Sequence, residues 1–325
     1  MFHTSPTSPQ DRRSQQLDKV RRPAVATPRP HQGLSPSRRA VLMALAGAGA
    51  AAVVGGQPAA AAGVPPWETT VDYIYLLIGQ SNMAGRAPIE DQDREVVPGA
   101  YLFDPSERWT PVSNAPLGLN RYSTVETPRV EITRLGPGYT FARTLSEATG
   151  RKVGLVVNAK GGTSISQWRK QDPAGVFPLY AEAVRRTRAA LLGTPSARLR
   201  GIIWHQGESD NRAGVGEYYL PALRRMVDQL REDLQARSAV FVAGEVGTWQ
   251  GRGAYINPVL RTISDQIKNS ALVTSEGLTT HETTTVTWGP HFDSASQRTF
   301  GRRYAEAVLD LHSPGRRSLS AASRG

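Results

Sequence analysis

Apolar runs alternate with amphipathic segments along most of the chain after residue 70. Five of these runs have the length of strands and almost no polar alternation: residues 71–78, 152–157, 199–204, 240–243 and 271–274. Runs of this kind are typical of strands that are buried on both faces of a parallel sheet. The pattern therefore predicts a buried parallel sheet of five strands.

Segments with helical spacing of apolar residues lie between these runs, at residues 139–148, 177–192, 215–234, 258–268 and 294–311. In residues 215–234, for example, Tyr219, Leu223 and Met226 recur every three or four positions. Alternating strands and helices predict an α/β fold, one three-layer α/β/α domain with helices on both faces of the sheet. Residues 86–135 have neither pattern and are predicted to be a long loop, a feature that is often functional.

The composition narrows the classes of function. The 325 residues include no cysteine, which excludes disulfides, thiolate nucleophiles and Cys-ligated metals. The formal net charge is +11, but residues 1–40 hold eight Lys/Arg and two Asp and so carry +6 of it. The remainder shows no basic stripe interleaved with aromatic residues, so no nucleic-acid partner is expected.

The N-terminal region has the order of an export signal. Residues 1–37 are rich in Pro, Ser, Arg and Gln, and Arg38-Arg39 directly precedes an apolar run at 40–54 that ends in small residues before Gly63. A basic segment, a short apolar run and an Ala-rich end are typical of a cleaved signal peptide, and paired arginines favour the twin-arginine route. A membrane anchor is the alternative, but fifteen Ala- and Gly-rich residues are short for a span.

These features predict a secreted protein in three parts. Residues 1–62 form a disordered N-region plus signal peptide, residues 63–312 a single domain, and residues 313–325 a disordered tail. After cleavage of the signal, no stable membrane association is expected.

Polar and glycine-rich segments follow the predicted strands, where ligands bind in open parallel sheets. Ser81 lies in the segment GQSNMAG after the first strand, at a strand-to-helix turn where a hydroxyl can attack a carbonyl if a base is near. A helix N-cap is the alternative role. After the second strand, Gly161-Gly162 allows backbone N–H groups to approach a substrate oxygen, although an ordinary turn is equally typical of this pair.

Two further segments carry candidate groups. WHQGESD follows the third strand, and in it Gln206 can donate hydrogen bonds to an oxyanion, while Glu208 and Asp210 can orient a base or bind hydroxyls. His291 lies just before the last helix and suits general-base chemistry, although a lone histidine is often only a packing residue. No metal-ligand spacing joins the histidines, so no metal is expected.

In this order, GQSNMAG, NAKGGTSISQW, WHQGESD and HFDSASQRTFGRRYA resemble the SGNH-hydrolase superfamily, and within it carbohydrate esterase family 6 and the sialate O-acetylesterase domain. The resemblance covers residues 72–312. It implies a flavodoxin-like five-stranded sandwich and ester hydrolysis without a cofactor. Ser81 is then the nucleophile and His291 the base, and the oxyanion hole is formed by Ser81, Gly162 and Gln206.

The third triad member departs from the superfamily pattern, because Trp288 occupies the position where many members have Asp. The resemblance favours Glu208 for this role, with Asp293 and Glu282 as alternatives, or a Ser–His dyad. Asn82, Arg86 and Trp168 are predicted to contact substrate.

The predicted function is removal of O-acetyl groups from carbohydrate, with acetylated xylan favoured over O-acetyl sialic acid. One alternative is an aryl or short-chain esterase, although no long apolar stretch suggests a lipid tunnel. The other is a carbohydrate-binding protein with an inactive esterase site, which the replacement at Trp288 motivates.

Overall fold

The computed structural model describes residues 70–126, 134–171, 178–283 and 286–313, and for residues 281–283 and 286–288 the backbone alone. The predicted signal region, residues 1–62, lies outside the described residues, as do residues 314–325 of the predicted tail. In the part of the chain that is described, no helix combines the length and the apolarity that a membrane crossing requires.

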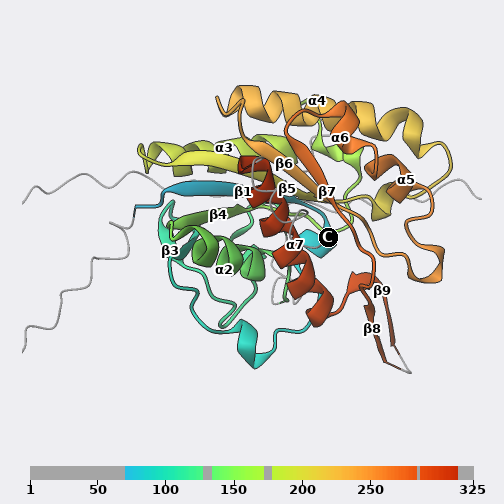
Figure 1. The fold of residues 1–325 in the computed structure, drawn as a ribbon, viewed down its shortest axis with the longest axis horizontal. Helices are drawn as coiled ribbons and strands as arrows, with labels where there is room; N and C mark the ends of the chain where they lie inside the picture. Colours follow the sequence, from blue (N-terminus) through green and yellow to red (C-terminus); the bar gives the residue numbers. More distant parts are fainter. Residues whose placement is uncertain (1–69, 127–133, 172–177, 284–285, 314–325) are drawn as a thin grey trace, which may run out of the picture. The chain divides into compact units, whose positions relative to one another are not determined.

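A seven-stranded sheet forms the centre of the domain, in the order β3-β2-β4-β1-β5-β6-β7 (Figure 1). The strands are β1 (Tyr73–Gly79), β2 (Ala100–Phe103), β3 (Trp109–Pro111), β4 (Val153–Val157), β5 (Arg198–His205), β6 (Val240–Gly244) and β7 (Ser270–Val273). All neighbouring pairs are parallel except β2–β3, which is antiparallel. A separate hairpin pairs β8 (Thr280–Thr283) with β9 (Val286–Phe292).

The α/β class and all five expected strands are confirmed, but the predicted number of strands is wrong. The two additional strands, β2 and β3, lie inside residues 86–135, which were expected to be loop. With four and three residues, at one end of the strand order, they are too short to show a strand pattern.

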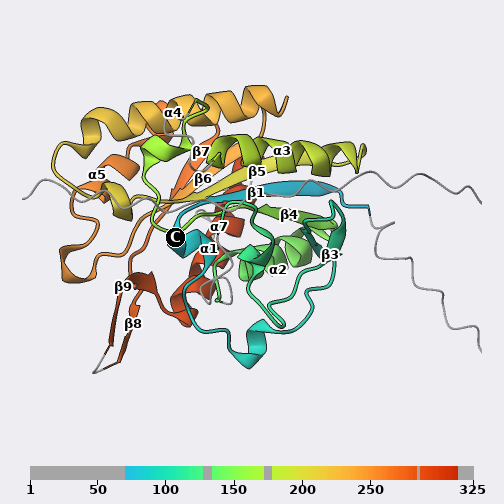
Figure 2. The same cartoon turned by 180° about the vertical axis from the view of Figure 1, so that it is seen from behind.

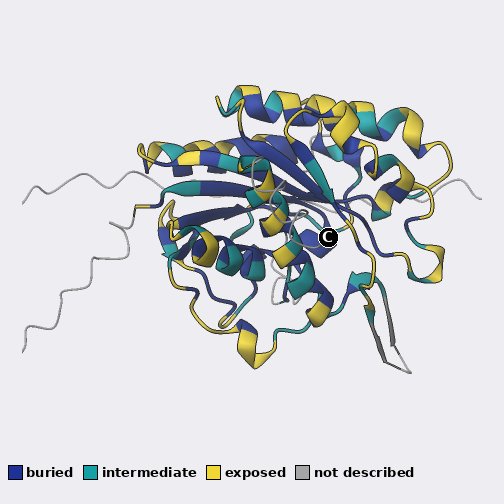
Figure 3. Cartoon of the chain, viewed as in Figure 1, coloured by how far each residue is buried: buried dark blue, intermediate teal, exposed yellow. Residues whose placement is uncertain are grey.

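Helices cover both faces of the sheet (Figures 1 and 2). One apolar cluster packs α2 (Gly138–Thr149) and α7 (Ser294–His312) against the sheet, and a second packs α3 (Leu179–Leu192), α4 (Val215–Asp233), α5 (Ile256–Leu260) and α6 (Ile263–Gln266). The strands of the central sheet are mostly buried, and the exposed positions lie on the outer sides of the helices and in the loops (Figure 3). Burial of apolar side chains on both faces is the main stabilising contribution to such a fold.

The remaining helical elements are short. They are α1 (Ser81–Ala84) and the 3-10 turns η2 (Asp91–Asp93), η3 (Leu119–Tyr122), η5 (Ile165–Trp168), η6 (Glu208–Asp210) and η7 (Trp249–Gly251). The first three of the predicted polar segments follow β1, β4 and β5, which are neighbours in the sheet. Because parallel strands end at the same edge, these segments meet there, and β9 brings the fourth segment to the same place.

Candidate active site

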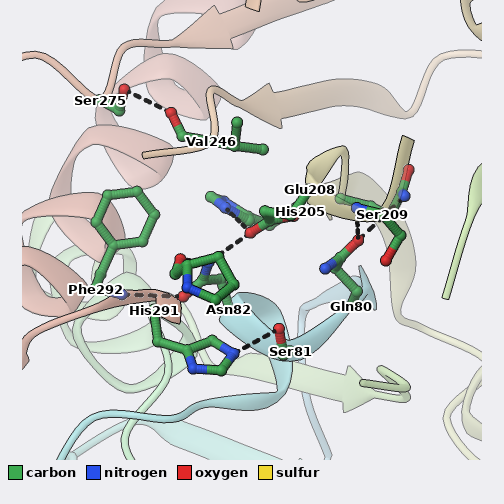
Figure 4. Close-up of polar contacts among 12 residues, drawn as sticks. Gln80, Ser81, Asn82, His205, Glu208, Ser209, Val246, Ser275, His291 and Phe292 are labelled. Atoms are coloured by element: carbon green, nitrogen blue, oxygen red, sulfur yellow. Dashed lines mark hydrogen bonds and ion pairs between the residues drawn. The ribbon is translucent and has the colours of Figure 1, made fainter. Parts of the chain in front are cut away.

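Ser81 and His291 lie together although 210 positions separate them in the sequence. Ser81 is the first residue of α1, directly after β1, and His291 is the second-last residue of β9. The His291 Nε2 atom lies 3.1 Å from the Ser81 Oγ atom (Figure 4). This distance is within hydrogen-bond reach, so the imidazole is placed to take a proton from the hydroxyl.

The pair opens into a cleft of about 390 Å³. The cleft is lined by Gln80, Ser81, Arg86, Gly162, Glu208, Ser209, Pro290 and His291. Its volume falls within the range of small-molecule pockets, and most of its lining groups are polar. The cleft therefore suits a compact, hydroxyl-rich ligand better than a long acyl chain.

Gly79 determines how Ser81 reaches the cleft. The last residue of β1 pairs with His205 at the end of β5, and a Cβ atom on Gly79 would lie 2.2 Å from the His205 carbonyl oxygen. Its φ of 137° is also unfavourable for residues with a side chain. Glycine at this position thus permits the close approach of β1 and β5 at the point where the chain leaves β1 and enters α1.

Two residues that line the cleft, Ser81 and Gly162, have backbone N–H groups that are candidates for an oxyanion hole. Ser81 begins α1, and the first N–H groups of a helix have no intrahelical acceptor. In the Gly161-Gly162 pair, the Gly161 N–H donates to the Glu126 carboxylate at 2.9 Å, whereas Gly162, with φ 71°, lines the cleft. Of the two glycines, Gly162 is therefore the one available to the substrate.

The structure places Gln206 away from this position. Gln206 is 0% exposed, and its side-chain N–H groups donate to the Gln80 side chain, the Thr163 carbonyl and the Asp210 carboxylate at 2.7–3.1 Å. An amide with two hydrogens and three acceptors has none to offer a substrate. In this arrangement the Gln206 side chain joins three loops beneath the cleft, and its predicted oxyanion role stays a prediction.

Asn82 does not reach the substrate cleft, because it is 1% exposed. Its amide group donates to the Pro290 carbonyl at 2.9 Å and accepts from the Phe292 N–H at 3.2 Å. These are the backbone groups on either side of His291, and Figure 4 shows Asn82 beside His291 and Phe292. The structure therefore gives no support to a substrate contact at Asn82, whose amide holds the segment that carries the imidazole.

Glu208 lies at the cleft but is bound to Asn82 rather than to the imidazole ring. Its Oε1 atom accepts a hydrogen bond from the Asn82 amide and lies 3.6 Å from the His205 Nε2 atom. Burial alone would raise the pKa of Glu208, but the contact with His205 and the hydrogen bond from Asn82 outweigh it, and the net shift is downward. Glu208 is therefore a buried carboxylate held in its ionised form.

The alternatives for the third triad member have different outcomes. Asp293 caps α7 by accepting from the Ser296 N–H and also accepts from the Thr279 hydroxyl, so its carboxylate is committed to the helix start. Glu282 and Trp288 lie in β8 and β9, and their side chains are outside the described part of the structure.

The two other predicted substrate contacts differ. Arg86 lines the cleft, where it donates to the Gly85 carbonyl and lies 3.8 Å from the Glu126 carboxylate. Trp168 is 0% exposed and packs edge-on against Trp204 in the core. The structure is thus consistent with a substrate contact at Arg86 and contradicts one at Trp168.

Three cleft residues were not singled out from the sequence, namely Gln80, Ser209 and Pro290. Each directly adjoins a residue that was: Ser81, Glu208 and His291 respectively. Glu126, which binds the Gly161 N–H, lies in the long segment before β4 and has no local signal. Within the described residues, no cluster of three or more His, Asp or Glu side chains is arranged to hold a metal ion.

The fold and the site together define an α/β protein with a serine–imidazole pair at the carboxyl edge of its parallel sheet. Comparison with known families agrees with this class. Residues 71–310 match the family model described as carbohydrate esterase, sialic acid-specific acetylesterase. The match spans most of the chain, and the protein therefore belongs to this family. The predicted carbohydrate acetylesterase activity class is confirmed at this level.

Individual relatives agree with the family. A probable carbohydrate esterase of Arabidopsis thaliana is 29% identical over 193 residues, which is 54% of this chain and 67% of the relative. The X-ray structure of that protein covers 74% of this chain and 98% of its own, with 23% identity and a TM-score of 0.62. The crystal structure of NanS has 20% identity and a TM-score of 0.56, covering 75% of this chain and 98% of its own.

A carbohydrate acetylesterase from Xanthomonas citri has 19% identity and a TM-score of 0.50, covering 73% of this chain and 56% of its own. At these identities the solved structures establish the shared fold.

Proposed function

We propose that this protein is a secreted serine esterase that removes O-acetyl groups from carbohydrate through an acyl-enzyme on Ser81. The observation that carries the proposal is the 3.1 Å contact between the Ser81 hydroxyl and the His291 imidazole at the floor of a polar cleft. A hydroxyl is a weak nucleophile at neutral pH, and an adjacent imidazole is the usual means of activating it.

The reaction follows acyl-transfer chemistry in two halves. The His291 Nε2 atom takes the Ser81 proton as the oxygen attacks the acetyl carbonyl carbon, and the carbonyl oxygen becomes an oxyanion. The N–H groups of Ser81 and Gly162 stabilise this charge, which is a large contribution in such sites. The imidazolium then protonates the departing sugar oxygen, and the acetyl group stays on Ser81.

Hydrolysis of the acyl-enzyme repeats these steps with water. His291 takes a proton from the water as it attacks the acetyl carbonyl, and returns the proton to Ser81 as acetate leaves. Both half-reactions use only side-chain and backbone groups of this chain, so the proposed mechanism needs no cofactor.

The proposed substrate is an acetylated carbohydrate, with acetylated xylan first, as for enzymes of the family 6 type, and O-acetyl sialic acid second. The polar lining of the cleft, including Gln80, Arg86 and Ser209, supports a sugar over a lipid. The Arg38-Arg39 pair before the apolar run 40–54 supports export by the twin-arginine route, which would bring the enzyme to extracellular polysaccharide.

Acetate release from acetylated xylan and from O-acetyl sialic acid, measured with the purified protein, tests the proposal. The matched control is Ser81→Ala, which removes one oxygen atom. We expect the wild-type protein to release acetate and the variant to lose at least about 10³-fold in kcat. Absence of turnover on both sugars and on p-nitrophenyl acetate would contradict the proposal and favour a sugar-binding protein. Turnover of the aryl ester alone would favour a general short-chain esterase.

A further inference from the structure

Asn82 directly follows the proposed nucleophile, and its side chain binds the backbone on both sides of the proposed base, His291. Its Nδ2 atom donates to the Pro290 carbonyl at 2.9 Å, and its Oδ1 atom accepts from the Phe292 N–H at 3.2 Å. Because Asn82 directly follows Ser81, one rigid amide couples the position of the His291 backbone to the position of the nucleophile. A displacement of this amide would alter the Ser81–His291 distance without touching either reacting group.

Glu208 fixes the orientation of this amide. Its Oε1 atom accepts the second hydrogen of the Asn82 Nδ2 group, which distinguishes the nitrogen end of the amide from the oxygen end. The other carboxylate oxygen, Oε2, is buried and has no hydrogen-bond partner among the described residues. All resolved polar side-chain contacts of Glu208 therefore run through the oxygen that faces Asn82 and His205.

His205 completes the arrangement from the core side. It is buried, its Nδ1 atom lies 2.8 Å from the Tyr304 hydroxyl, and its Nε2 atom faces Glu208 at 3.6 Å. The rings of Phe292 and Phe300 pack edge-on against it, with centroids 5.8 and 5.1 Å away. These contacts hold the His205 ring in the core, and its Nε2 atom, which has no hydrogen-bond partner among the described residues, faces the buried Glu208 carboxylate.

We propose that Glu208 acts on the base through Asn82, as a positioning residue, and that His205 fixes Glu208 for this purpose. The inference rests on the proposed function, since it concerns the same serine and imidazole. It replaces a direct carboxylate–imidazole contact at Glu208 with an indirect chain: His205 holds Glu208, Glu208 orients Asn82, and Asn82 holds the backbone of His291.

A positioning role and a direct contact with the imidazolium predict different activities for Glu208→Gln. Glutamine keeps an acceptor oxygen for Asn82 and places its nitrogen where Oε2 has no partner, so a positioning role keeps kcat within about tenfold of wild type. A carboxylate that stabilises the imidazolium directly is worth far more, about 10⁴ in kcat when its charge is removed. The acid limb of the kcat/KM profile should also stay in place in Glu208→Gln, because the charge does not act on the ring.

A double-mutant cycle tests whether the effect passes through Asn82. Asn82→Ala and Glu208→Ala should each lower kcat by about 10²-fold, the order expected when a reacting group is displaced by about 1 Å, with KM nearly unchanged. If Glu208 acts through Asn82, the double variant should be no worse than Asn82→Ala. Multiplication of the two effects to about 10⁴ would overturn the inference, as would a 10⁴-fold loss in Glu208→Gln.

Asn257→Ala is the matched control for stability. Asn257 is also buried and also bridges backbone groups, the N–H and carbonyl of Val246, with both hydrogen bonds at 3.0 Å, but it does not line the cleft. We expect it to lower the melting temperature and to leave kcat unchanged. An equal loss of kcat in this control would show that destabilisation alone explains the Asn82 effect, and would overturn the inference.

Labelling of Ser81 by a fluorophosphonate, which needs the base but no sugar, separates the two levels of the argument. If the wild-type protein is neither labelled nor hydrolytic, the proposed function itself is contradicted. If the wild-type protein is labelled, but the losses in labelling rate of the Asn82 and Glu208 variants multiply in the double variant, only the positioning role is contradicted.

Discussion

Gln206→Ala separates a structural role from a chemical one in the segment after β5. The side chain is fully buried, it donates to Gln80, Thr163 and Asp210, and it accepts from the Tyr219 hydroxyl at 2.9 Å. The variant leaves these groups without their shared partner and opens a polar cavity beneath the cleft. We therefore expect the variant to lose stability and to keep its chemistry.

The size of the effect follows from these contacts. An unsatisfied buried polar group costs about 1–3 kcal/mol, and truncation of a large core side chain adds a cavity contribution. We expect a total of about 4 kcal/mol for Gln206→Ala, within the tail of single-substitution effects. For a domain of this size, each kcal/mol lowers Tm by about 2–4 °C, which gives a decrease of about 8–16 °C. An oxyanion donor would instead cost about 10²–10³ in kcat.

The assay combines thermal unfolding followed by circular dichroism with hydrolysis of p-nitrophenyl acetate at 20 °C, well below the transition. Tyr219→Phe is the control, because it removes only the hydroxyl that donates to the Gln206 oxygen. We expect kcat of Gln206→Ala to stay within about tenfold of wild type. A kcat reduced by 10² or more, with Tm within about 2 °C of wild type, would refute the reasoning and restore Gln206 to the oxyanion hole.

Three further variants test other parts of the structure. Gly79→Ala should greatly reduce soluble yield and Tm, because its Cβ atom would lie 2.2 Å from the His205 carbonyl oxygen at a φ of 137°; a wild-type melting curve would contradict this. Burial, and then the charge of Arg200, lower the pKa of His312 to about 4, so the unfolded chain binds more protons and stability should fall as pH decreases from about 6.5 to 4. His312→Asn should remove that part of the pH dependence of Tm, and an unchanged dependence would count against it. Trp168→Phe should lower Tm and leave KM unchanged, because the ring is fully buried, whereas a tenfold higher KM would place it at the substrate.

Much of the fold could be predicted from the sequence because the central strands are buried on both faces. Such strands are largely apolar, so β1, β4, β6 and the second half of β5 stand out as continuous runs. The strands β2 and β3 are stabilised by pairing at one end of the sheet rather than by their own pattern. Runs of three or four residues are too short to show a periodicity from which a strand could be recognised.

The site was predictable in its location and less so in its orientation. Strand topology brings the residues after β1, β4 and β5 to one edge, and in the structure Ser81 and Gly162 line the cleft there. It does not determine which way a neighbouring side chain points. Asn82 and Gln206 adjoin residues that line the cleft, but their side chains point into the core. There their amides donate hydrogen bonds to backbone carbonyls, and the sequence does not show which carbonyls need such a partner.

The two groups of the proposed catalytic pair come from opposite ends of the described domain. Ser81 follows its first strand, His291 precedes its last helix, and all the other strands of the central sheet lie between them. If Ser81 and His291 act as proposed, the serine hydroxyl cannot react during refolding until the hairpin of β8 and β9 has docked against it. The lag before hydrolysis begins, measured after dilution from denaturant, would therefore report the rate at which this hairpin docks. No added label would be needed, because the substrate itself provides the signal.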